Sequence, residues 1–254
     1  MLNGIDIQDY NPETDAHIAA NYSIQDLSGK ARCKEALQRN LNLNVDPSVP
    51  IIGMVGRLSN QKGLYLIDYV IADIMRLNVQ LVVLGMGEGR YFNLFSWAEG
   101  EYQGRVAARF TMDHALAHQI YAGSDLFLMP SQFEPCGLSQ MIAMRYGTVP
   151  LVRETGGLRD TVLSYNEYSG EGTGFTFFNY NAHDMLHTIE RAVDYYNHHQ
   201  DIWHTLQDRG MNADFSWDHS AQEYLKLYRS LFQPRAQEEP VAEGKNPVVM
   251  DEIS

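Results

Sequence analysis

Apolar and polar positions follow two alternating patterns along most of the chain. The first is a short apolar run flanked by turn-forming residues, which is typical of a strand buried on both faces of a sheet. Runs of this kind are Val49–Leu58, Val79–Gly87, Val106–Phe110, Asp125–Pro130 and Val149–Val152. A further apolar segment, "FTFFN", follows the glycine-rich stretch Gly170–Gly174. The pattern therefore predicts five or six strands before Asn179.

Between these runs, apolar residues recur every three or four positions, as they do on the buried side of a helix. The clearest stripe, in Gly63–Leu77, is Leu64, Ile67, Ile71, Ile74 and Met75. The other predicted helices are Lys30–Leu43, Tyr91–Tyr102, Ala115–Gly123, Leu138–Tyr146, Ala182–His198, Ile202–Arg209 and His219–Phe232, and one more begins within Leu158–Leu163. The opening segment Asn3–Asp15 is rich in turn formers and is predicted to be irregular.

Strands that alternate with helices indicate parallel crossover connections. We therefore expect the α/β class, with one parallel sheet and helices on both of its faces. A single Rossmann-like domain fits Val49–Arg209, within a folded region of residues 1–232. Residues 233–254 contain three prolines, five acids and no periodicity, which predicts a disordered acidic tail.

Composition narrows the possible function classes. The formal net charge is −13 and the pI is about 5.0, so the overall field repels nucleic acid and anionic membrane surfaces. No apolar stretch is long enough to cross a bilayer, and the chain opens without a secretion signal. Cys33 and Cys136 are the only cysteines, which favours a reducing, cytoplasmic location over a disulfide scaffold.

Ligands of such sheets bind beyond the carboxyl ends of the strands, near the point where the strand order reverses. The turns at those ends are Gly56–Gly63, Gly85–Gly89, Ser131–Ser139 and Arg153–Gly157. The first turn contains Arg57 and Lys62, and Lys62 is expected to open the helix that follows. A phosphate placed there would meet two cations and the free amides of that helix. From the spacing alone, two solvated surface cations fit this turn equally well.

Glu134 precedes a sharp Pro-Cys-Gly turn that leads into the predicted helix from Leu138. The amides of Leu138 and Ser139 would be free to meet an anion, and Glu134 could accept hydrogen bonds from a hydroxyl-rich ligand. A carboxylate that only caps the helix is the alternative. Cys136 has no base partner in the pattern, so we expect it to line a ligand or to pack.

Two other motifs carry weaker signals. "GMGEG" (Gly85–Gly89) has the wrong glycine spacing for a dinucleotide fingerprint. His114 and His118 share one face of a predicted helix, but the sequence offers no HExxH pattern and no evident third ligand. We therefore expect no metal site and no cofactor.

Three strings carry a family resemblance: "FEPCGLSQMIAMRYGTVPLVRETGGLRDTV", "GRLSNQKG" and "NGID…YNPETD". They resemble the carboxyl-terminal half of bacterial glycogen and starch synthases, from about Asn3 to Leu231. The resemblance implies one half of a GT-B fold, in which two Rossmann domains face a cleft. It also implies a retaining glucosyltransferase that moves glucose from ADP-glucose to the non-reducing end of an α-1,4-glucan.

The resemblance also implies roles for particular residues. Arg57 and Lys62 match the pair that grips the donor diphosphate, and Glu134 matches the carboxylate that faces the donor glucose. Cys136, Gly137 and Leu138 match the turn around the sugar, and Ser139 matches a position whose amide meets phosphate. Gly156 and Gly157 form a further close-approach turn, which we expect to bind substrate. The adenine contacts correspond to Thr111 and Met112. The family often has an aromatic residue in place of Met112, and Ile142 stands where related transferases have a second glutamate.

The family's amino-terminal acceptor domain has no counterpart in this sequence. The resemblance therefore implies that this chain is a donor-binding half, that the missing domain is its partner in cis, and that the fragment alone is inactive. Two alternatives remain open at this point. One is a different GT-B transferase that uses UDP-glucose, and the other is a non-catalytic nucleotide-binding module.

Overall fold

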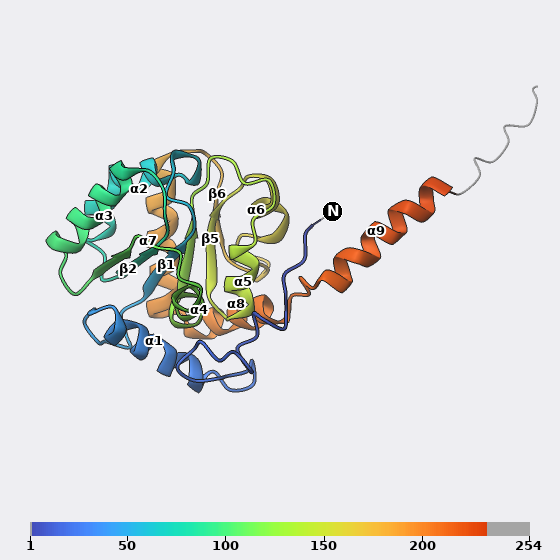
Figure 1. Cartoon of the computed structure of the whole chain (residues 1–254), viewed down its shortest axis with the longest axis horizontal. Coiled ribbons are helices and arrows are strands. Elements are labelled where there is room, and N and C mark those ends of the chain that lie inside the picture. Colours follow the sequence, from blue (N-terminus) through green and yellow to red (C-terminus); the bar gives the residue numbers. More distant parts are fainter. Residues whose placement is uncertain (1, 233–254) are drawn as a thin grey trace, which may run out of the picture.

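The computed structural model describes residues 2–232, which form one α/β body with a projecting last helix (Figure 1). The core is a sheet of six strands in the order β3-β2-β1-β4-β5-β6, and all five strand pairs are parallel. The strands are β1 (Ile51–Val55), β2 (Gln80–Leu84), β3 (Val106–Arg109), β4 (Leu126–Met129), β5 (Val149–Arg153) and β6 (Phe175–Phe177). The predicted fold class is confirmed, and "FTFFN" supplies the sixth strand.

The helices fall close to the predicted segments. They are α1 (Ser28–Asn40), α2 (Leu64–Ile74), α3 (Gly89–Glu101), α4 (His114–Gly123), α5 (Ser139–Arg145), α6 (Gly156–Thr161), α7 (Ala182–His198), α8 (Gln200–Asn212) and α9 (Trp217–Phe232). Two details correct the prediction. Lys62 does not open α2 but ends a separate 3-10 turn, η1 (Asn60–Lys62). Helix α6 begins at Gly156 rather than Leu158. The sequence did not predict this start, because glycine is a poor helix former.

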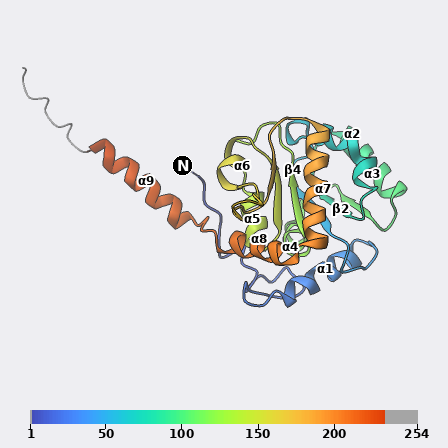
Figure 2. The ribbon, with the colours of Figure 1, turned by 180° about the vertical axis from the view of Figure 1, so that it is seen from behind.

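The two faces of the sheet are covered by different helices, because successive strand residues point to opposite sides. Ile52 and Met54 of β1 join the core beneath α2, α3 and α7, whereas Ile51 joins the core beneath α1 and α4. Helix α7 lies across the sheet on the face that it shares with α2 and α3 (Figure 2). Large apolar side chains on both faces explain why the strands read as continuous apolar runs.

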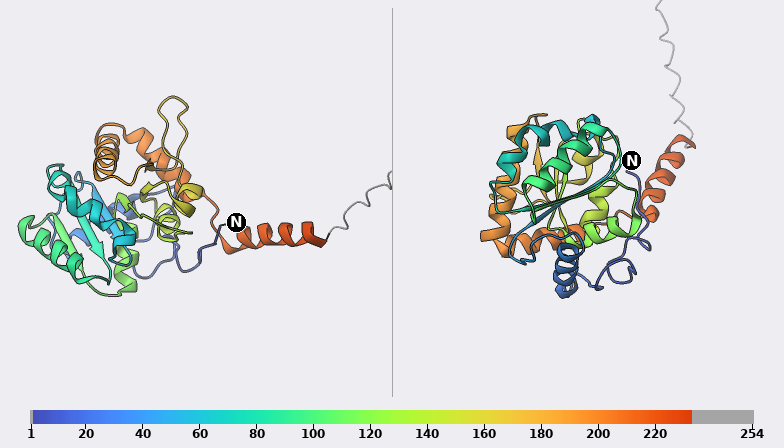
Figure 3. Two further views of the ribbon diagram at one scale, coloured as in Figure 1. Left: turned by 90° about the horizontal axis from the view of Figure 1, so that it is seen from above. Right: turned by 60° about the vertical axis from the view of Figure 1, so that its left-hand side comes forward.

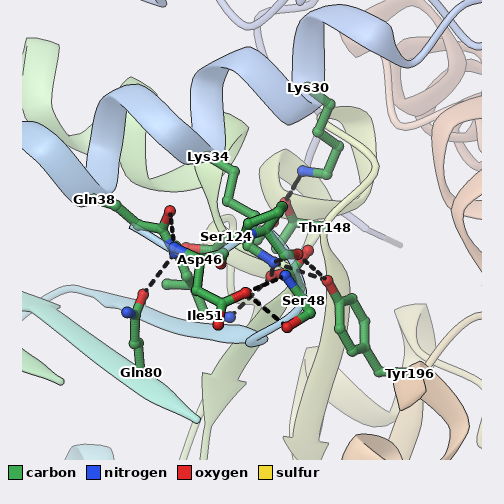
Figure 4. A network of polar contacts seen from close by, with 12 residues as sticks. Lys30, Lys34, Gln38, Asp46, Ser48, Ile51, Gln80, Ser124, Thr148 and Tyr196 are labelled. Carbon is green, nitrogen blue, oxygen red and sulfur yellow. Dashed lines mark hydrogen bonds and ion pairs between the residues drawn. The ribbon is translucent and has the colours of Figure 1, made fainter. Parts of the chain in front are cut away.

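Helix α1 is fixed to the amino ends of the strands by buried lysines (Figure 4). Lys34 Nζ lies 2.8 Å from Asp125 Oδ2 just before β4. Lys30 Nζ donates to the carbonyls of Ala122 and Ser124, both at 2.9 Å, and to Thr148 Oγ1 at 2.7 Å. Burial lowers the pKa of Lys30 to about 8. These contacts tie α1 to the edge of the sheet opposite the predicted ligand turns.

The remaining features lie at the periphery. Helix α9 extends away from the body close to the amino-terminal segment (Figure 3). Leu225, Leu227, Tyr228 and Leu231 are exposed on it. The expected disordered tail, residues 233–254, lies outside the described residues. Within the described part of the chain, no helix is both long and apolar enough to cross a bilayer.

Candidate functional site

The strand order places the turns after β1 and β4 side by side. The chain builds outward from β1 to β3, then returns to place β4 next to β1, so the order reverses between these two strands. Open parallel sheets bind ligands at such a reversal. The turn after β1 contains Arg57 and Lys62, and the turn after β4 contains Glu134. The predicted site residues therefore share one edge of the sheet.

The closest contact between the two turns is an ion pair. Lys62 Nζ lies 2.5 Å from Glu134 Oε2, and Ser131 Oγ donates to the same oxygen at 3.2 Å. The Glu134 side chain is 10% exposed, whereas that of Lys62 is 30% exposed. The carboxylate is thus held from the interior by a hydroxyl and from the open side by an ammonium. Glu134 does not cap α5, because Leu138 occupies the N-cap position of this helix and no side chain there accepts from its first amides.

Hydrogen bonds to backbone carbonyls fix the segment before Glu134. The amide of Gln132 donates to the carbonyl of Gln61 at 2.8 Å, and Gln61 Nε2 donates to the carbonyl of Phe133 at 3.2 Å. Arg153 Nη1 donates to the carbonyl of Gln132 at 2.9 Å. Because three separate donors fix the segment before Glu134, its carboxylate is presented by a rigid loop.

The two predicted glycines pack against the same loop. A Cβ at Gly156, where φ is +47°, would lie 2.1 Å from the carbonyl oxygen of Glu134. A Cβ at Gly157 would lie 1.9 Å from the carbonyl oxygen of Cys136. The amide of Gly157 donates to the carbonyl of Glu134 at 3.1 Å. The glycines therefore allow the start of α6 to approach the loop closely.

Arg57 lies between two cavities at the carboxyl edge of the sheet. The smaller cavity, about 80 Å³, is lined by Arg57, Lys62, Ser131 and Ser139 among others. The larger cavity, about 600 Å³, is also lined by Arg57. No carboxylate of residues 2–232 lies within salt-bridge distance of Arg57, so its guanidinium is available to an anion.

The larger cavity contains both residues that the resemblance assigned to the adenine contacts. It is lined by Val55, Gly56, Arg57, Leu84, Gly85, Met86, Thr111, Met112, Asp113, His114 and Ala117. Met112 is 91% exposed and Met86 is 46% exposed, so thioethers rather than an aromatic ring form its open wall. The cavity therefore offers mostly apolar walls, with the cation of Arg57 at its border.

The structure does not bring every predicted residue to a cavity. Ser139 lines the smaller one, but Glu134, Gly156 and Gly157 line neither cavity. Cys136, Gly137 and Leu138 also line neither and form the turn between Glu134 and α5. Gly137 has φ +71°, which this turn requires. Sequence reasoning did not single out Ser131 and Met86, although each lies two residues after the end of a strand and that position was the available signal.

The "GMGEG" segment has a packing explanation. A Cβ at Gly85 would lie 1.8 Å from the carbonyl oxygen of Gly56, and one at Gly87 would lie 2.0 Å from that of Leu58. A parallel bridge joins Leu58 to Gly87. These glycines let the turns after β1 and β2 pack together, which is consistent with the prediction that the segment is not a dinucleotide fingerprint.

Comparison with known proteins gives consistent results. Residues 36–204 match the family Glycosyl transferases group 1. The chain is 53% identical to a glycogen synthase of Desulforamulus reducens over 231 residues, covering 91% of this chain and 48% of the relative. It is 52% identical to a glycogen synthase of Bacillus cereus over 233 residues, covering 92% of this chain and 49% of that protein.

A solved structure with the same fold is the catalytic domain of starch synthase IV from Arabidopsis thaliana, bound to ADP and acarbose. It superimposes with a TM-score of 0.84 at 39% identity, covering 91% of this chain and 48% of the other. The chain thus spans about half the length of the relatives that it matches. The resemblance noted in the sequence is confirmed, and the chain belongs to the group 1 glycosyl transferases.

Proposed function

We propose that this chain is the donor-binding half of a retaining glucosyltransferase. The full enzyme moves glucose from ADP-glucose to the non-reducing end of an α-1,4-glucan, in the synthesis of glycogen or starch. The observation that carries the proposal is the meeting of Arg57, Lys62 and Ser139 around one cavity beside Glu134. The names of the relatives, and the ADP bound to the starch synthase, support the same donor.

The donor is proposed to lie along the carboxyl edge of the sheet. Its adenine occupies the larger cavity near Thr111 and Met112, and its diphosphate lies at the smaller cavity between Arg57 and Lys62. Its glucose then lies against the turn that follows β4. Charge-assisted hydrogen bonds from the two cations supply much of the affinity.

Lys62 is also proposed to stabilise the leaving diphosphate. Its ammonium contacts Glu134 in the structure, and in the proposed complex it contacts both the carboxylate and the diphosphate. As the bond from the anomeric carbon to the diphosphate breaks, negative charge grows on the leaving group. Arg57 and Lys62 stabilise that charge, while Glu134 stabilises the positive charge that develops at the sugar.

Retention of configuration follows from attack on the front face of the sugar. The acceptor hydroxyl oxygen bonds to the anomeric carbon on the side from which the diphosphate departs. The leaving diphosphate takes the hydroxyl proton, so this half needs no separate general base. No metal or cofactor is included in this proposal.

A second domain in cis completes the proposed enzyme. It supplies the acceptor side of the cleft and excludes water from the anomeric centre. The exposed apolar residues of α9, such as Leu225 and Leu231, are its proposed contact surface. The free thiols of Cys33 and Cys136 fit a cytoplasmic location.

The test is a glucose-transfer assay with glycogen as the acceptor. Residues 1–254 are assayed alone and joined to the corresponding first half of the Bacillus cereus relative, each with ADP-glucose and with UDP-glucose. We expect the joined protein to elongate glycogen with ADP-glucose and the single chain to be inactive. Transfer from UDP-glucose alone would replace the proposed donor. Inactivity of a folded joined protein with both donors would favour a non-catalytic nucleotide-binding module.

A further inference from the structure

Three side chains from two separate segments converge beside the first turn of α4. The Nε2 atoms of His114 and His118 lie 3.1 Å apart. Asp9 Oδ2, from the irregular amino-terminal segment, lies 3.7 Å from His114 Nε2 and 4.0 Å from His118 Nε2. The sequence placed the two histidines on one helix face but gave no third ligand, and the fold supplies it.

The spacing of these atoms matches a tetrahedral metal centre. Zinc–nitrogen bonds of roughly 2.0–2.1 Å at tetrahedral angles place neighbouring ligand atoms about 3.3 Å apart. The distances among Asp9, His114 and His118 run from 3.1 to 4.0 Å, so small side-chain shifts close the triangle. The Asp9 and His114 side chains are 45% and 56% exposed, which leaves them free to make those shifts.

A buried hydrogen-bond network orients His118 as a ligand. His118 Nδ1 lies 2.7 Å from Asp15 Oδ2, and the Tyr146 hydroxyl donates to the same oxygen at 2.5 Å. Because a carboxylate can only accept, His118 carries its proton on Nδ1 and leaves Nε2 bare toward His114. A carboxylate behind a histidine is the usual outer partner of a metal-binding imidazole.

Packing contacts explain only part of the arrangement of Asp9, His114 and His118. Tyr10 stacks on His118 with ring centroids 4.8 Å apart, and His17 lies edge-on to the same ring at 5.0 Å. These contacts explain why His118 is buried. A hydrogen bond between the two Nε2 atoms, 3.1 Å apart, also holds His114 against His118, but it does not explain why the exposed carboxylate of Asp9 lies within 4.0 Å of both nitrogens.

We propose that Asp9, His114 and His118 bind a divalent transition-metal ion of the zinc type. Two imidazoles and one carboxylate are ligands that Zn²⁺ accepts, with the remaining position left for water. The ion would fasten the amino-terminal segment to α4. It would also stand at the edge of the larger cavity, since His114 lines both places.

The experiment is a calorimetric titration of ZnCl₂ into the untagged chain, with Co²⁺ absorption as a second probe of ligand geometry. Wild-type protein should bind one Zn²⁺, and saturating Zn²⁺ should raise its unfolding temperature. Asp9→Asn and His114→Ala, both at exposed positions, should lose that site. His187→Ala is the matched control, because its side chain is 84% exposed on α7 and far in sequence from the cluster.

The outcomes separate this site from adventitious binding by surface histidines. The proposal is supported if Asp9→Asn and His114→Ala lose Zn²⁺ binding while His187→Ala keeps it. Equal binding by all four proteins, or no saturable binding by wild type, overturns it. Asp15→Asn should weaken Zn²⁺ binding by about 10- to 100-fold in protein that retains its fold. None of these readouts involves ADP, so failure here leaves the proposed function standing.

Discussion

The ammonium of Lys62 and the carboxylate of Glu134 are 72 positions apart in sequence and 2.5 Å apart in space. The contact joins the turns after β1 and β4 at the reversal of strand order. It places a cation that can meet the donor diphosphate directly beside the acid that can face the donor sugar. The pair would therefore link the proposed nucleotide binding to the proposed chemistry.

The pair predicts separate effects on rate and on binding for Glu134→Gln in the joined enzyme. Turnover should fall by at least about 100-fold, because the lost charge matters most when positive charge develops at the sugar. ADP affinity should be unchanged or higher, since Lys62 is released toward the phosphates. Steady-state kinetics and ADP titration of the same preparation check this. Equal losses in rate and in ADP affinity would instead indicate a structural role for Glu134.

Gly156 is predicted to be intolerant of a side chain. Gly156→Ala should lower the free energy of unfolding by about 2 kcal/mol or more, because φ is +47° and the new Cβ meets the Glu134 carbonyl. Gly89→Ala is the matched control, since a Cβ there meets nothing within 4 Å. Urea unfolding of both variants checks the difference. Similar stabilities for the two would show that the loop around Glu134 is not tightly packed.

Lys30 is predicted to make stability depend on pH in the alkaline range. Burial lowers its folded-state pKa to about 8, below the ordinary value of 10.5. Between these two pKa values the unfolded chain binds more protons at Lys30 than the folded chain does. The contribution of Lys30 to the free energy of unfolding therefore rises with pH, and this gain is lost as the pH falls toward 8. Relative to Lys30→Met, wild type should gain about 2 kcal/mol between pH 7 and pH 9.5.

Urea unfolding of wild type and Lys30→Met at several pH values measures this difference. The comparison cancels the titration of groups common to both proteins. A stability difference that stays constant from pH 7 to pH 9.5 would mean that the three oxygens around Lys30 hold it fully charged throughout.

Sequence patterns predicted the strands and most helices because both periodicities arise locally. They also predicted that the turns after β1 and β4 lie at one edge of the sheet, since the carboxyl ends of parallel strands share that edge. They could not predict contacts between distant segments, such as Lys62 with Glu134 or Asp9 with His114. The start of α6 was missed for a local reason, because Gly156 and Gly157 were selected for close approach and not for helix propensity.

The most direct test of the account is ADP binding to this chain. Titration calorimetry should show one saturable ADP site, with affinity reduced about 10- to 100-fold in Arg57→Ala and in Lys62→Ala, since each charge-assisted hydrogen bond contributes roughly 1.5–3 kcal/mol. Lys226→Ala, which removes an exposed lysine of α9, should bind as wild type does. Failure to bind ADP, or the same affinity in all four proteins, would contradict the claim that the edge between β1 and β4 holds the donor.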